Sequence, residues 1–157
     1  MFFLKSDYKS AIAIIIGLLV LTGCAASRDK RISIIYPQNN ESSGWPDKKL
    51  EKRFQEYWSS LFAGRVEEAY QIETPLFREM VPLGKYNNYV KHTRTNKLMN
   101  VEIREIAKET DFLISVASIF RTQVDDDKPV NTPIFDRWVF VGKNWYHVIK
   151  DPLLLSF

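Results

Sequence analysis

The sequence has few of the residues that build metal centres and covalent cross-links. Cys24 is the only cysteine in 157 residues, so no disulfide can form within one chain. The only histidines are His92 and His147, too few for a zinc site of the Cys and His type once Cys24 is set aside. A metal site made of carboxylates is not excluded by these counts, but no pattern in the sequence marks one. We expect no cofactor and no metal, and a domain whose stability rests on its apolar core alone.

An excess of one charge is also missing. The chain has 22 basic and 19 acidic residues and a net charge of +3. A nucleic-acid-binding domain needs a clustered basic face, so this balance predicts no nucleic-acid partner. The run Asp125-Asp126-Asp127 lacks the alternating ligand spacing and the glycine of a helix-loop-helix calcium site. It predicts a solvated loop.

No apolar run is long enough to cross a membrane as a helix. Residues 11–21 form an apolar stretch that follows Lys5 and Lys9, whereas a spanning helix needs about 20 apolar residues. A cationic start, a short apolar stretch and then small residues are typical of a secretory signal. Here the stretch ends on Leu21-Thr22-Gly23-Cys24.

This ending resembles the lipobox of bacterial lipoproteins. The resemblance implies that the thiol of Cys24 receives a diacylglyceryl group and that the chain is cut before Cys24, so that acyl chains attach it to the membrane. Ala25, where aspartate would retain such a protein at the inner membrane, favours the periplasmic face of an outer membrane if the source has one. The alternatives are an uncleaved membrane anchor and an ordinary secretory signal with a chance cysteine.

We expect three parts: a signal peptide at residues 1–23, the lipidated Cys24 with a tether at 24–46, and one domain at 47–157. The tether is polar apart from residues 32–36, a short β-prone run. Two interpretations of that run stay open: an edge strand packed on the domain, or plain linker.

Helical spacing and then strand spacing follow one another within the predicted domain. Apolar residues three and four apart predict a first helix at 47–63, and weaker patterns predict helices at 66–72 and 83–93, with one more helical turn at 76–81. Alternation predicts strands at 99–108, 112–122, 134–141 and 145–149, the last two joined by a turn at Gly142. The expected fold is α+β: three N-terminal helices on a curved four-stranded antiparallel sheet.

The closing hairpin carries Trp138, Gly142, Trp145 and Tyr146. With the order of elements, it resembles the nuclear transport factor 2-like fold, in which a bent sheet wraps around the helices as a cone with a pocket. A cystatin-like sheet on one long helix is the alternative, but it would leave the second and third helices unexplained. The C-terminal residues 153–157 are apolar apart from Ser156. Two interpretations stay open: the tail folds back over the mouth of the cone, which we favour, or it joins a contact with a protein or a membrane.

The resemblance suggests an enzyme of the ketosteroid isomerase or dehydratase type as one possibility, with a base and donors inside the cone. Available side chains are Tyr70, Tyr86, Tyr89, His92, Asp136 and His147, and none falls in a recognisable catalytic set. A tyrosine at helical spacing is more simply part of a core, and a strand histidine is more simply hydrogen-bonded structure. We therefore expect a non-catalytic module that binds a small apolar ligand or an envelope protein.

Overall fold

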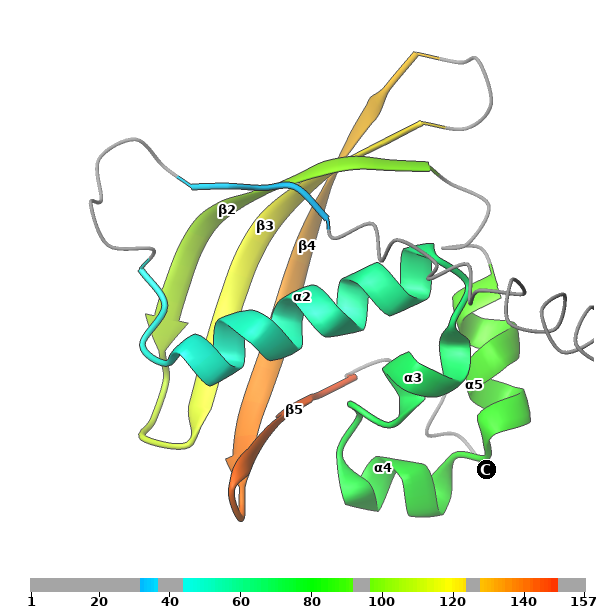
Figure 1. Ribbon diagram of the computed structural model, residues 1–157. Coiled ribbons are helices and arrows are strands. Elements are labelled where there is room, and N and C mark those ends of the chain that lie inside the picture. Colours follow the sequence, from blue (N-terminus) through cyan, green and yellow to red (C-terminus); the bar gives the residue numbers. More distant parts are fainter. Residues whose placement is uncertain (1–31, 37–43, 92–96, 124–127, 150–157) are drawn as a thin grey trace, which may run out of the picture.

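The structure, a computed structural model, describes residues 32–36, 44–91, 97–123 and 128–149. These residues form a five-stranded sheet with helices against one of its faces (Figure 1). The strands lie in the order of the sequence, and β1 is parallel to β2 while every other pair is antiparallel. Their bounds are β1 Ile34–Ile35, β2 Lys97–Lys108, β3 Leu113–Gln123, β4 Val130–Val141 and β5 Asn144–His147.

The longest helix, α2 (Lys48–Phe62), crosses the inner face of the sheet (Figure 1). It begins at Asp47, whose side chain accepts a hydrogen bond of 2.8 Å from the backbone N–H of Lys49 and so caps the first turn. It ends before Gly64, whose φ of 75° suits a helix stop. The apolar stripe predicted from the spacing is buried against the sheet: Leu50, Phe54, Tyr57, Trp58 and Leu61.

Three short helices lie beside one another near the end of α2 (Figure 1). They are α3 (Val66–Tyr70), α4 (Pro75–Met80) and α5 (Leu83–Tyr89). Thr74 accepts a hydrogen bond from the N–H of Phe77, and Pro75 occupies the first turn of α4, where no N–H is needed. None of the described helices combines the length and apolar character that a membrane crossing requires.

The predicted fold class is wrong in its sheet and in its helix count. The sheet has five strands and is mixed, because residues 34–35 add β1 as a parallel edge strand beside Val101 and Glu102. This edge strand was one of the two open interpretations of residues 32–36. A two-residue strand is too short for alternation to mark it, and its partner lies far along the chain. The predicted extra turn at 76–81 is a helix of its own, α4.

The strands beyond β2 follow the predicted order, but β4 starts at Val130 rather than at 134. Pro133 lies inside β4 and faces Ile119 of β3, whereas β5 pairs only with residues 138–141 of β4. The first half of β4 is therefore an edge strand, where a proline is tolerated because its missing N–H faces no neighbour. The predicted turn at Gly142 is confirmed, with φ of 64°.

Candidate functional site

Three ionisable side chains are buried together between the helices and the sheet. Glu73, in the connection between α3 and α4, has no exposed surface, and Asp136 of β4 and His147 of β5 are about 5 % exposed. The backbone brings them together: the N–H of His147 donates to the carbonyl of Ile72 at 2.9 Å, and His147 lies beside Glu73 in an isolated parallel bridge. We call Glu73, Asp136 and His147 the buried triad.

Both ring nitrogens of His147 face carboxylates. Nδ1 lies 3.0 and 3.1 Å from the two oxygens of Glu73, and Nε2 lies 3.3 Å from Oδ1 of Asp136. Burial alone would lower the pKa of His147, but the charge of Glu73 and the hydrogen bonds with Asp136 and Glu73 outweigh it and raise the pKa to about 10. The imidazole is therefore a cation that donates from both nitrogens.

Aromatic side chains supply the remaining donors to the two carboxylates. The hydroxyl of Tyr57 lies 2.8 Å from Oε1 of Glu73, and that of Tyr86 lies 3.3 Å from the same oxygen. Burial and the charge of Glu73 raise the pKa of both phenols, so they stay protonated. The indole N–H of Trp58 donates to Oδ2 of Asp136 at 2.9 Å.

These contacts make the buried triad a structural network rather than an accessible catalytic centre. A general base needs a free lone pair and contact with the substrate. His147 has neither a free ring nitrogen nor an open face, because the ring of Tyr57 stacks on it at a centroid distance of 4.1 Å. The network joins α2, the α3–α4 connection, β4 and β5. Its hydrogen bonds and ion pairs hold the helices on the sheet.

Of the residues predicted to line a pocket, Tyr86, Asp136 and His147 do come together, but they do so inside the core. Tyr70 packs on the ring of Tyr86 at 5.3 Å, and its hydroxyl lies 2.6 Å from the carbonyl oxygen of Val81. Tyr89 is 42 % exposed. His92, Cys24 and the tail at 153–157 lie outside the described residues.

Sequence reasoning missed Glu73, Tyr57 and Trp58 as members of this network. The helical spacing places Tyr57 and Trp58 on the apolar stripe of the first helix, where they do lie. Glu73 stands between a short helix and Thr74-Pro75, which in sequence is typical of a solvated connection. The only signal was that a lone carboxylate follows the apolar Ile72.

Surface hollows lie elsewhere. A hollow of about 730 Å³ lies at α3 and α5, a second of about 600 Å³ lies alongside α2, and a third of about 350 Å³ lies where α2 meets the β4–β5 turn. No member of the buried triad lines any of the three. Among the described residues, no cluster of three potential metal ligands was found.

The fold is similar to solved structures whose sequences differ widely from this chain. One is a SEC-C motif containing protein from Psychrobacter arcticus, with a TM-score of 0.55 and 14% identity over 70% of this chain; the chain spans 62% of that protein. Another is a SEC-C motif containing protein from Rhodopseudomonas palustris, with a TM-score of 0.51 and 9% identity over 63% of this chain and 74% of that one. No family model and no curated protein sequence matches.

These neighbours correct the family resemblance drawn from the sequence. They are SEC-C motif containing proteins, so the nuclear transport factor 2-like assignment is wrong. It relied on a hairpin of aromatic residues, and such a hairpin forms in many antiparallel sheets because aromatic pairs stabilise any of them. Neither neighbour gives evidence for a lipoprotein or a signal peptide, so recognition of the chain as a lipoprotein is unsupported by the comparisons.

Because the buried triad raises the pKa of His147, we expect the stability of the fold to fall as the pH rises above neutral. The folded pKa of His147, about 10, lies above the ordinary value of 6.5, so its stabilising effect is complete below about pH 6.5 and is lost as the pH rises towards 10. From pH 7 to 9 we expect the free energy of unfolding in urea to fall by up to about 1.4 kcal/mol per pH unit. His92→Gln should keep this slope. A constant or rising stability over that range would contradict the protonated state of His147.

Proposed function

We propose that the chain is a lipid-anchored, non-catalytic module of the bacterial cell envelope that binds a partner protein through the outer face of its sheet. The observation that carries this proposal is the exposed side chain of Phe135, which lies on the uncovered sheet face, in the part of β4 that forms the edge of the sheet. The buried triad supports the non-catalytic part, because its ionisable groups are engaged with one another and shielded from solvent.

The outer face has an apolar patch at the free edge of β4, and charged side chains lie near it. Phe135 is 80 % exposed, and across the sheet it lies beside Ala117, with Pro133 two residues away on its own strand facing Ile119. None of the described helices covers this face (Figure 1). Charged side chains of the same face lie near this patch on β2, β3 and β4, namely Glu102, Glu105, Arg121 and Arg137. An exposed apolar patch with polar residues near it is typical of a protein interface.

The proposed anchor rests on the sequence, where Lys5, Lys9 and the apolar stretch at 11–21 lead to Cys24. Two or three acyl chains would make attachment effectively permanent. The fold limits how far the domain extends from that anchor, because β1 is paired with β2 and the N–H of Ile32 donates to Oγ of Ser59 at 3.4 Å. Residues 24–31 then reach about 26 Å at most, at about 3.3 Å per residue. The partner we expect is therefore itself at the membrane.

Site-specific photo-cross-linking in cells tests this proposal. With a photoreactive amino acid at position 135 of the full chain, we expect one discrete protein adduct in the membrane fraction. The matched control is position 76, because Leu76 of α4 is also a strongly exposed apolar residue, at 63 %. The same photoreactive residue in a Cys24→Ser chain should lose both the membrane association and the adduct. Equal adducts at 135 and 76 would reject the outer face as the binding surface, and an unchanged membrane fraction for Cys24→Ser would reject the anchor.

A further inference from the structure

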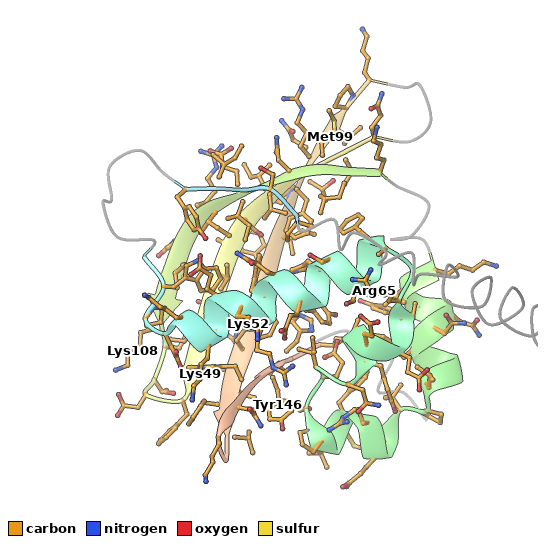
Figure 2. The ribbon with its side chains drawn as sticks, viewed as in Figure 1. Lys49, Lys52, Arg65, Met99, Lys108 and Tyr146 are labelled. Carbon is orange, nitrogen blue, oxygen red and sulfur yellow. The ribbon has the colours of Figure 1, made fainter. Side chains whose placement is uncertain are left out.

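A basic hollow lies on a different part of the surface, where the start of α2 meets the β4–β5 turn. Its volume is about 350 Å³. Figure 2 labels Lys49 and Lys52, which lie at the start of α2 on the side nearer to the β4–β5 hairpin. The lining is Lys49, Lys52, Arg53, Glu56, Lys143, Asn144 and Trp145.

Positive charge in this hollow exceeds the negative charge that could neutralise it. Glu56 is the one acidic residue of the lining, and it is shared by Lys52 at 3.6 Å and Arg53 at 3.3 Å. Lys49 and Lys143 form no ion pair among the described residues. The positive end of the α2 dipole adds to the same field.

A further carboxylate bonded to residues of the lining, that of Asp47, is already engaged. Oδ1 of Asp47 accepts from the N–H of Lys49 at 2.8 Å, and Oδ2 accepts from the indole N–H of Trp145 at 2.8 Å. Even when Asp47 is counted with Glu56, four cations face two carboxylates. The hollow therefore keeps a net positive charge.

The two elements that supply the cations are fixed to one another. The hydrogen bond from Trp145 to Asp47 joins β5 to the start of α2. Trp145 is only 6 % exposed, so its ring is packed in place where it lines the hollow. Lys143 follows Gly142 at the tip of the hairpin, where the positive φ of Gly142 makes the turn. The backbone positions of Lys49 and Lys143 are thus fixed on two elements that border a shared space.

We propose that this hollow binds the phosphate group of a small phosphorylated ligand. A phosphate carries up to two negative charges and several strong acceptor oxygens, which suit lysine ammonium groups and an arginine guanidinium. Ligand pockets usually measure about 300–1,000 Å³, so 350 Å³ fits a small ligand. The inference is independent of the proposed protein contact, because the hollow and Phe135 use different residues.

Calorimetric titration of the full chain in detergent with inorganic pyrophosphate tests this inference. At 50 mM salt we expect saturable binding that weakens at 300 mM salt, since the contacts are ionic and exposed. Lys49→Glu and Lys143→Glu should each weaken binding at least tenfold. Lys128→Glu is the matched control, because it makes the same charge change at an exposed lysine outside the hollow, and it should change the affinity less than twofold.

Three results would overturn the inference. The first is no binding at millimolar pyrophosphate, and the second is equal weakening of binding by all three charge reversals. The third is that Lys49→Glu and Lys143→Glu remain folded and bind pyrophosphate as tightly as the parent chain does. A second titration separates the two sources of phosphate. If vesicles of phosphatidylglycerol, but not pyrophosphate, bind in a way that depends on Lys49 and Lys143, the ligand is a lipid headgroup and the proposal of a small ligand is wrong. Neither titration changes the cross-linking expected at position 135.

Discussion

Replacing Glu73 with alanine should lower the free energy of unfolding by about 3–5 kcal/mol, the usual cost of removing one partner from a buried ion pair. The substitution leaves the buried imidazolium of His147 with Asp136 alone and takes the shared acceptor from Tyr57 and Tyr86. Domains of this size are stable by about 5–15 kcal/mol, so the variant should be close to unfolding. Urea unfolding followed by circular dichroism at pH 7 measures the loss.

Glu67→Ala is the matched control, because Glu67 is an exposed glutamate of the neighbouring α3 and should change stability by less than about 0.5 kcal/mol. Glu73→Gln provides a second test. It keeps the shape of the side chain but removes its charge, so it should also flatten the decline of stability between pH 7 and 9. Equal stabilities of the Glu73→Ala and Glu67→Ala chains would show that the network does not hold the helices on the sheet.

Local patterns predicted the elements that build the buried triad, but not the triad itself. The first helix and the closing hairpin follow from spacing and from a glycine turn, and both depend on residues close in sequence. Asp136 and His147 were named as candidates because their side chains can serve as a base or as a hydrogen-bond donor. Glu73 was not, because its burial depends on a bridge to His147, 74 residues away. No periodic pattern marks a charged residue in a connection as buried.

Strand β1, which the sequence left open between an edge strand and plain linker, also depends on residues far along the chain. Ile34 and Ile35 are β-prone, but whether they pair depends on the free edge of β2, which only the assembled sheet provides. In contrast, the strand predicted at 112–122 has apolar residues on both of its faces, which predicts a central strand that is at least partly covered on each face. On the outer face, Leu113, Ala117 and Ile119 are half-buried, which agrees with that prediction. The alternation did not show that Phe135, which lies opposite Ala117 on the same face, is almost fully exposed.

The two faces of β4 differ in exposure: Trp138 lies on the buried inner face and Phe135 on the exposed outer face. Trp138 has no exposed surface, and its ring packs near Tyr57 at 5.9 Å and His147 at 5.3 Å. Its indole N–H has no hydrogen-bond partner among the described residues, so Trp138→Ala removes packing rather than a bond. The expected cost is about 3–5 kcal/mol.

Phe135→Ala removes another large aromatic ring from the same strand, but from its exposed outer face, and should cost less than about 0.5 kcal/mol. Thermal melting of the two purified variants decides between the faces. A large drop in the melting temperature for Trp138→Ala alone would place the core on the inner face. Phe135 would then not be needed for folding, as expected of a residue that contacts a partner protein. Similar drops for both would mean that the outer face is part of the folded core, and the proposed binding surface would then be lost.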